Sequence, residues 1–90
     1  MRSAPRVLVK FTGQWCAPCK ALEPTLEAIV EERPAITVLE LDADDCPDVA
    51  ARFGVRVLPT LVLFADGVER TRIIGNQRKS AILAVIDEHG

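Results

Sequence analysis

Two cysteines, Cys16 and Cys19, stand three positions apart where an apolar strand pattern changes to a helical one. The run from Val7 to Phe11 predicts a strand that delivers Cys16 to the start of the next helix. Unsatisfied N–H groups and the helix dipole favour an anion at such a start, and a thiolate is an anion. Stabilising the thiolate lowers the pKa of the thiol and makes it a better nucleophile toward disulfides. The pair is therefore interpreted as a redox dithiol.

Other interpretations of the two thiols are a pair of inert buried side chains and one half of a zinc site. A structural zinc site needs four ligands, and the sequence has no second Cys-x-x-Cys. Cys46 and His89 are the other soft ligands, and His89 is interpreted as a frayed terminal residue. Cys46 is interpreted as an incidental thiol near a helix start, with a redox or dimerising role as its alternative.

The composition is that of a globular protein with one core. Ninety residues, 49% of them hydrophobic, suffice for one domain over residues 1–90 and are too few for two. The formal net charge of -2 argues against a nucleic-acid-binding or polybasic membrane surface, because both need clustered Lys and Arg. No long apolar stretch follows Met1 to Pro5, and three cysteines do not pair into a secreted framework. We therefore expect a cytoplasmic protein.

Hydrophobic periodicity predicts seven elements. They are strands over Val7–Phe11, Ile36–Asp42, Leu61–Phe64 and Val68–Ile74, and helices over Ala17–Arg33, Pro47–Phe53 and Gln77–Glu88. The first helix is expected to bury the apolar residues that recur at helical spacing, which are Leu22, Leu26, Ile29 and Val30. Asn76 is expected to cap the last helix.

The connections between the predicted strands indicate how the sheet is arranged. A right-handed crossover through the first helix makes the first two strands parallel. The dipeptide Asp66-Gly67 predicts a hairpin, which makes the last two strands antiparallel. The predicted fold class is therefore α/β, with a mixed four-stranded sheet and helices on both faces.

The sequence Trp15-Cys16-Ala17-Pro18-Cys19-Lys20 resembles the Trp-Cys-Gly-Pro-Cys-Lys site of thioredoxins, with Ala17 in place of glycine. Pro24 matches a proline inside the family's helix, Leu58-Pro59-Thr60 resembles its cis-proline segment, and Gly75 falls at its substrate-groove glycine. The resemblance covers nearly the whole chain. It implies a thioredoxin-like fold with strand order 2-1-3-4, without the family's usual first strand and helix.

The resemblance also implies a site. It implies a redox-active disulfide between Cys16 and Cys19, with no other cofactor and no metal. In the expected reaction Cys16 attacks a protein disulfide and Cys19 resolves the mixed disulfide. The substrate groove implied beside the cysteines is lined by Trp15, Ala17, Pro18, Leu58, Pro59, Thr60, Gly75 and Asn76. Trp15 is equally compatible with a place in the core.

Lys10 interrupts the first predicted strand and falls where thioredoxins carry a buried aspartate behind the cysteines. A charged Lys10 would stabilise a Cys19 thiolate, whereas a neutral Lys10 could accept its proton. A third interpretation is a functionally silent lysine whose amine reaches solvent. Glu40 on the neighbouring strand is a candidate partner that would keep Lys10 charged. Lys20 is a second candidate modulator of the thiol pKa.

The predicted function is enzymatic reduction of protein disulfides, with recycling by a thioredoxin-reductase-like or glutaredoxin-type system. One alternative is an oxidant or isomerase of the same fold, favoured if a charged Lys10 stabilises the reduced dithiol. Another is a thioredoxin-fold binding subunit whose cysteines are dispensable. No nucleic-acid or membrane partner is expected. We expect a monomer, with a weak dimer through the edge strand Ile36–Asp42 as the alternative.

Overall fold

The computed structural model describes residues 6–89 and contains the seven predicted elements in the predicted order. They are β1 (Arg6–Thr12), α1 (Ala17–Glu32), β2 (Ile36–Asp42), α2 (Pro47–Arg52), β3 (Thr60–Ala65), β4 (Val68–Ile74) and α3 (Lys79–His89). The four strands form one mixed sheet in the order β2-β1-β3-β4, which confirms the predicted fold class. None of the helices within residues 6–89 combines the length and the apolar character needed to cross a membrane.

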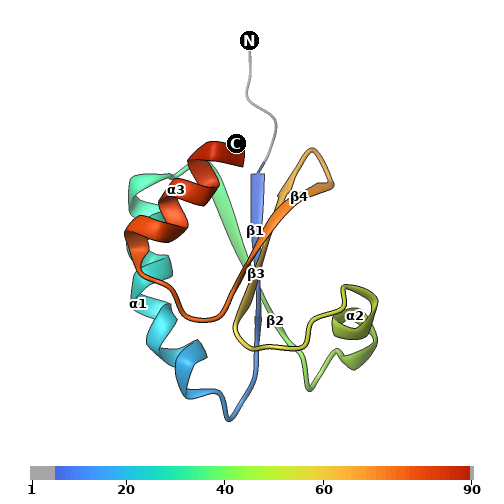
Figure 1. Ribbon diagram of the computed structural model, residues 1–90. Coiled ribbons are helices and arrows are strands. Elements are labelled where there is room, and N and C mark those ends of the chain that lie inside the picture. Colours follow the sequence, from blue (N-terminus) through green and yellow to red (C-terminus); the bar gives the residue numbers. More distant parts are fainter. Residues whose placement is uncertain (1–5, 90) are drawn as a thin grey trace.

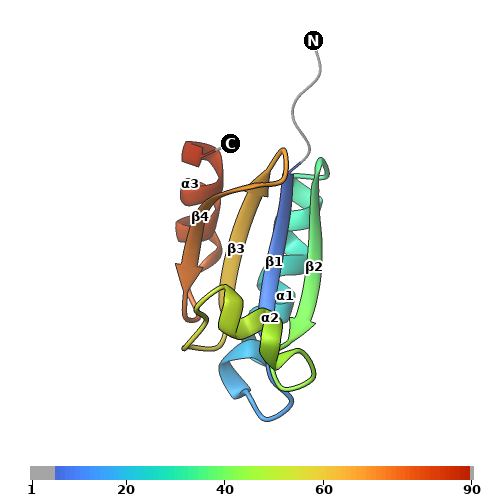
Figure 2. The ribbon, with the colours of Figure 1, turned by 90° about the vertical axis from the view of Figure 1, so that its right-hand side faces the viewer.

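The register of the central strand β1 places each of its side chains against defined neighbours. β1 runs parallel to β2 and antiparallel to β3, so that Lys10 lies opposite Glu40 on one side and Leu61 on the other. Strand β3 turns back into β4 at Asp66 and Gly67, whose φ angles are 58° and 77°. Positive φ at both central residues is typical of the tight hairpin turns whose twist matches that of the strands. The predicted hairpin is confirmed, and Figure 2 shows the four strands side by side.

Helices cover both faces of the sheet, with α1 and α3 on one face and α2 on the other (Figure 1). The larger core cluster, under α1 and α3, consists of Leu8, Leu22, Leu26, Ile29, Ile36, Leu61, Leu63, Ile73, Ile82 and Ile86. The smaller cluster, on the α2 face, consists of Val9, Phe11, Ala50 and Val62. Successive side chains of a strand point to opposite faces, so Lys10 lies on the α1 face together with Leu8.

The buried stripe of α1 is narrower than predicted. Leu22, Leu26 and Ile29 are buried as expected, but Val30 is exposed. Val30 lies at the margin of the helix beside the edge strand β2, where it lines an open pocket with Val38. The spacing of apolar residues identifies the buried face, but the width of that face depends on how far the sheet extends beneath the helix.

The predicted cap at Asn76 is wrong, because α3 begins three residues later at Lys79. The first backbone hydrogen bonds of α3 go to the Arg78 carbonyl. The side chain of Gln77 donates to the Ile74 carbonyl at 3.1 Å. This local bond provides a donor for the carbonyl of the last residue of β4, in the non-helical segment before α3.

Two ion pairs tie the end of α1 to α3. Arg33 donates two hydrogen bonds to the Asp87 carboxylate, at 3.0 and 2.7 Å. Lys79 bonds to Glu32. The hydrogen bonds from Arg33 hold the pKa of Asp87 below its ordinary value of 3.8, and the hydrogen bond from Lys79 lowers the pKa of Glu32 in the same direction.

These ion pairs predict that part of the stability is lost in acid. A carboxyl group with a lowered pKa in the folded state binds its proton more readily in the unfolded chain. Its contribution is therefore complete above the unfolded pKa of about 4 and disappears as the pH falls through the folded value. In urea unfolding between about pH 7 and pH 3, Asp87→Asn should lose less stability than the parent protein. Glu88→Gln, which removes a neighbouring exposed carboxyl, is the matched control. Equal pH sensitivity of the parent and Asp87→Asn would contradict the prediction.

Candidate active site

The strand register brings three chain segments together at one end of the sheet. The loop after β1 carries Cys16, the loop before β3 ends at Pro59, and Gly75 follows β4. The first residue of β3, Thr60, pairs with β1 on one side and with the end of β4 on the other. The Gly75 N–H donates to the Pro59 carbonyl at 2.8 Å, which extends this contact beyond the sheet.

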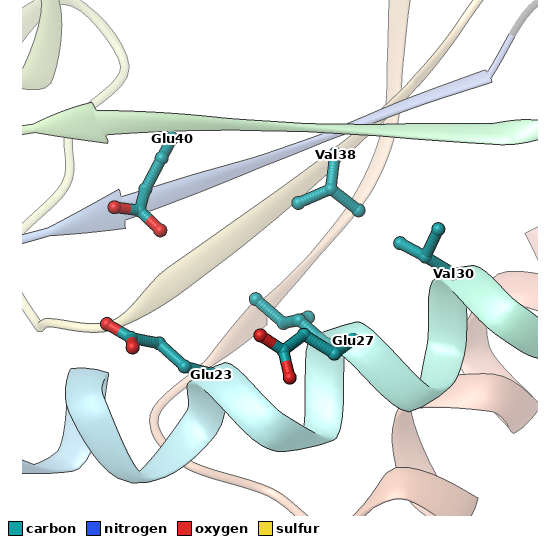
Figure 3. Close-up of a pocket in the computed structure, with 6 residues that line it drawn as sticks. Glu23, Glu27, Val30, Val38 and Glu40 are labelled. Carbon is teal, nitrogen blue, oxygen red and sulfur yellow. The ribbon is translucent and has the colours of Figure 1, made fainter.

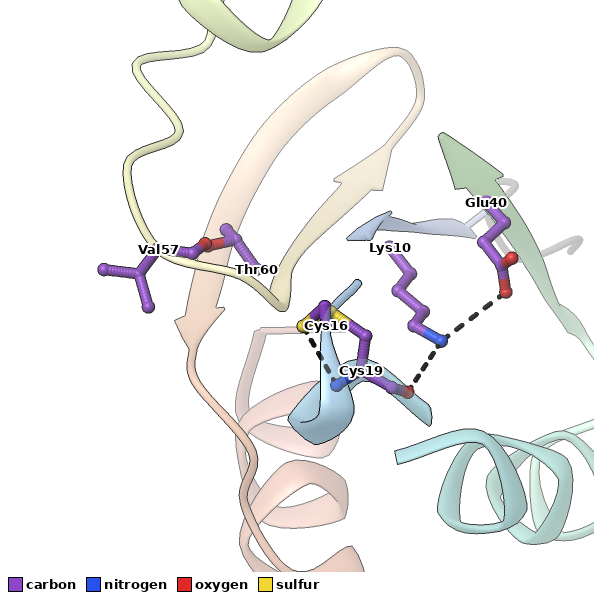
Figure 4. The surroundings of a disulfide bond; sticks show 6 residues. All are labelled: Lys10, Cys16, Cys19, Glu40, Val57 and Thr60. Carbon is purple, nitrogen blue, oxygen red and sulfur yellow. Dashed lines mark hydrogen bonds and ion pairs between the residues drawn. A yellow bond between two sulfur atoms is a disulfide. The ribbon is translucent and has the colours of Figure 1, made fainter. Parts of the chain in front are cut away.

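Cys16 and Cys19 form a disulfide, with their Cα atoms 5.2 Å apart (Figure 4). Cys16 is the N-cap residue of α1, and its Sγ accepts a hydrogen bond from the Cys19 N–H at 3.1 Å. The predicted position of the pair at a helix start is therefore confirmed. Cys19 is only 1% exposed, whereas Cys16 is half-buried. Cys16 is the sulfur that another molecule reaches first.

The start of α1 provides an environment suited to a thiolate. The backbone N–H that contacts Cys16 Sγ belongs to the first helical turn, where N–H groups lack partners within the helix. These groups and the helix dipole favour negative charge when the disulfide opens. Pro18 lies in this turn and has no N–H of its own, which costs nothing at a position without a helical acceptor. The arrangement can therefore support nucleophilic sulfur chemistry.

The loop before β3 has the conformation that the resemblance implied. The Leu58–Pro59 peptide bond is cis. Pro59 and Thr60 are buried, and Thr60 Oγ1 donates to the Val57 carbonyl at 2.6 Å. Gly75, which bonds to Pro59, has a φ of 84°, a conformation that glycine adopts without strain. These contacts fix the loop before β3 against the end of β4.

Exposed apolar side chains lie on the segments that flank the disulfide. Trp15 is 86% exposed, so its interpretation as a core residue is wrong. Val57 and Ile74 are also exposed, as are Ala17 and Pro18 beside the cysteines. Other large hydrophobic side chains, Val30, Leu39 and Val68, are exposed elsewhere on the fold.

Lys10 is fully buried behind the disulfide, so the interpretation in which its amine reaches solvent is wrong. Its Nζ donates to the Cys19 carbonyl at 3.1 Å and lies 3.5 Å from Glu40 Oε2 (Figure 4). The predicted pairing of Lys10 with Glu40 is confirmed. The side chain of Lys20 is exposed on α1. Its backbone N–H donates to the Cys16 carbonyl, with 3.3 Å between nitrogen and oxygen.

Gly13 is a site residue that the sequence analysis does not identify. It is buried, and a Cβ atom there would lie 3.0 Å from Leu58 Cδ1 and 3.8 Å from Cys16 Cβ. The loop that carries the cysteines therefore packs against the residue before Pro59, with little room for a side chain between them. A lone glycine after a strand is indistinguishable in sequence from an ordinary turn residue, so only the tertiary contact reveals it.

The described part of the chain, residues 6–89, contains no group of three or more His, Cys, Asp or Glu side chains placed to hold a metal ion. The interpretation of Cys16 and Cys19 as one half of a zinc site therefore has no support from further ligands within residues 6–89. Cys46 is a free, half-buried thiol at the N-cap of α2, and its side chain makes no capping hydrogen bond.

A mixed sheet that presents a disulfide at a helix start, beside a cis-proline loop, defines the chain as a thiol–disulfide oxidoreductase. The family model described as Thioredoxin matches residues 1–88. The chain belongs to the thioredoxin family. The redox group of this family is the cysteine pair of the protein itself, so the activity needs no separate cofactor.

Individual relatives agree with the family model. The thioredoxin of Chlamydia muridarum is 47% identical over 83 residues, which cover 92% of this chain and 81% of the relative. The thioredoxin of Mycobacterium bovis is 45% identical over 83 residues, covering 91% of this chain and 72% of the relative. The crystal structure of Fasciola hepatica thioredoxin has a TM-score of 0.88 at 31% identity, covering 98% of this chain and 84% of that one.

The contact at Gly13 predicts a graded response to side-chain size. Gly13→Ala places a Cβ against the tip of Leu58, which shifts easily, so a small loss of stability is expected. Gly13→Val adds two methyl groups in the same space and should lower the free energy of unfolding by roughly 1–3 kcal/mol. Urea unfolding of the oxidised proteins measures both changes. Superimposable unfolding curves for the parent and Gly13→Val would show that the two loops do not pack as described.

Proposed function

We propose that the chain reduces disulfide bonds in other proteins, with Cys16 as the attacking thiol and Cys19 as the resolving thiol. The observation that carries this assignment is the difference in accessibility between the two sulfurs. Cys16 is half-buried at the N-terminus of α1, whereas Cys19 is 1% exposed beneath it. A large substrate disulfide can approach Cys16 and not Cys19.

The reaction consists of two thiol–disulfide exchanges. The Cys16 thiolate attacks one sulfur of the substrate disulfide, so that a mixed disulfide forms and one substrate thiolate leaves. Cys19 then loses its proton to the buffer, and its thiolate attacks Cys16 Sγ. The mixed disulfide breaks, and the second substrate thiolate leaves. Two electrons have passed to the substrate, and the Cys16–Cys19 disulfide has formed.

The substrate backbone is proposed to lie beside the disulfide. Trp15, Ala17 and Pro18 would contact the substrate on one side. The loop from Leu58 to Thr60, in which Pro59 and Thr60 are buried, would support the other side, with Gly75 at its end. The exposure of Trp15 and the bond between Gly75 and the Pro59 carbonyl support this arrangement. Exposed apolar side chains such as Trp15 favour polypeptide segments over small thiols as substrates.

Turnover requires a source of electrons for the disulfide. We assign this role to a thioredoxin-reductase-like or glutaredoxin-type system, which would return two electrons and two protons to Cys16 and Cys19. The proposed setting is the cytoplasm, where such systems keep thiols reduced. The proposed working form is a monomer, with pairing through the β2 edge as a weak association at high concentration.

An oxidant or isomerase role is a second candidate, and the buried Lys10 favours it. A positive charge near Cys19 stabilises the reduced dithiol, and a stabilised reduced form makes the disulfide a stronger oxidant. The reduction potential of the Cys16–Cys19 pair decides between the two directions. A value near about -270 mV is that of a reductant, whereas values from about -180 to -120 mV are those of isomerases and oxidants. Equilibration with glutathione of known potential provides the measurement, and a value in the second range would overturn the reductant assignment.

Cysteine variants test the proposed mechanism. Cys16→Ser should abolish the reduction of insulin disulfides followed by turbidity, because the attacking sulfur is lost. Cys19→Ser should still attack but should accumulate a mixed disulfide, which is visible as a covalent adduct under non-reducing conditions. Cys46→Ser is the matched control and should retain the parent rate. Full activity of Cys16→Ser would contradict the redox mechanism and favour a binding subunit.

A further inference from the structure

Lys10 is the one charged side chain of β1 that is completely buried, and it lies directly behind the redox pair. It shares the α1 face of β1 with Leu8, so its side chain extends toward the first turns of α1. Its Nζ donates to the Cys19 carbonyl at 3.1 Å. Its neighbour on β3 is Leu61, which carries no charge. The mechanism proposed above does not use this group.

Glu40 is the ion-pair partner of the Lys10 amine. The two residues are opposite each other in the parallel register of β1 and β2, and Glu40 Oε2 lies 3.5 Å from Lys10 Nζ. The Glu40 side chain is 57% exposed, so one end of the pair is in solvent while the other is buried. The carboxyl end lines an open pocket of about 350 Å³ between α1 and β2, together with Glu23 and Glu27 (Figure 3).

Two oxygen atoms lie close to the buried Lys10 amine, the Cys19 carbonyl oxygen at 3.1 Å and Glu40 Oε2 at 3.5 Å. Burial alone disfavours a charged lysine, but an adjacent carboxylate and a carbonyl acceptor compensate for lost hydration. Glu40 provides the carboxylate from β2, and Glu23 and Glu27 on α1 line the same pocket as Glu40. Lys10 therefore has an anionic partner on the solvent side and the backbone of Cys19 on the inner side.

We infer that Lys10 and Glu40 form a positioning pair that holds a positive charge behind Cys19 and stabilises the Cys19 thiolate. This inference rests on the proposed function, in which Cys19 must lose its proton before it attacks Cys16 Sγ. The pair does not touch the reacting sulfur and takes up no proton. It lowers the pH at which Cys19 becomes a thiolate, and Glu40 is needed because its carboxylate is the ion-pair partner of the buried amine.

The test isolates the Cys19 thiol. In a Cys16→Ser/Cys46→Ser background Cys19 is the only thiol, and its titration is followed by the ultraviolet absorbance of the thiolate. Lys10→Met removes the charge at similar volume and should raise the Cys19 pKa by about one unit or more. Glu40→Gln changes an exposed side chain and should raise it in the same direction, because burial then favours a neutral lysine. An unchanged or lowered Cys19 pKa in Glu40→Gln would show that Glu40 does not help to stabilise the Cys19 thiolate.

A charge-exchanged variant separates electrostatics from packing. Lys10→Glu/Glu40→Lys retains an ion pair between the strands but places a negative charge behind Cys19. If the pair acts through its positive charge, the Cys19 pKa should rise further than in Lys10→Met. With both cysteines restored, the reduction potential should shift toward more reducing values. If the exchanged protein titrates like the parent, or if Lys10→Met leaves the Cys19 pKa unchanged, the inference is wrong.

These outcomes are distinguishable from failure of the proposed function. Thermal unfolding identifies any variant that does not fold, and Glu40→Gln still tests the pair in that case. If the parent protein reduces no insulin but Lys10→Met raises the Cys19 pKa, the proposed function fails and the electrostatic pair stands. If the parent reduces insulin and none of the variants shifts the pKa, the pair fails and the proposed function stands.

Discussion

The alternation of side chains along β1 is the constraint on which the site depends. Leu8 and Lys10 face α1, whereas Val9 and Phe11 face α2. A shift of one residue against the neighbouring strands would exchange the faces, so that Phe11 would lie behind Cys19 and Lys10 would lie in an apolar cluster. Both faces are covered by helices, so both cores oppose that shift. The packing of the whole sheet therefore fixes which chemical group lies behind the cysteines.

The two sulfurs of the disulfide have different electrostatic surroundings. Cys16 receives a backbone N–H at the start of α1, whose position is fixed as long as the helix is folded. Cys19 lies beside a side-chain amine, and that amine depends on Glu40 across the strand. The stabilisation of negative charge at Cys16 comes from the secondary structure. At Cys19 it depends on two particular side chains, Lys10 and Glu40. The stabilisation at Cys19 can change between related proteins without changing the fold.

Sequence patterns predicted most of the fold because the relevant signals are local. Apolar strand patterns, the crossover through the first helix and the Asp66-Gly67 turn indicated a mixed four-stranded sheet, whereas the strand order came from the family resemblance. The Cys-x-x-Cys spacing at a helix start indicated the redox pair. The cis bond at Pro59 was accessible only through the resemblance, since most X-Pro bonds are trans. Among the non-local contacts, the pairing of Lys10 with Glu40 on the neighbouring strand was predicted, but the packing of loops against each other was not. The packing of Gly13 against Leu58 is an example, because these residues meet only after strands from distant parts of the sequence have paired.

The start of β1 and the end of α3 meet at the end of the sheet opposite to the disulfide (Figure 1). Arg6 Nη1 donates to the Ile86 carbonyl at 3.2 Å, which joins these two parts of the chain. The start of β1 and the end of α3 therefore both lie away from Cys16. This geometry is compatible with attachment to a larger protein or to a surface. An attachment at the end of the sheet that holds the start of β1 and the end of α3 would leave Cys16 accessible.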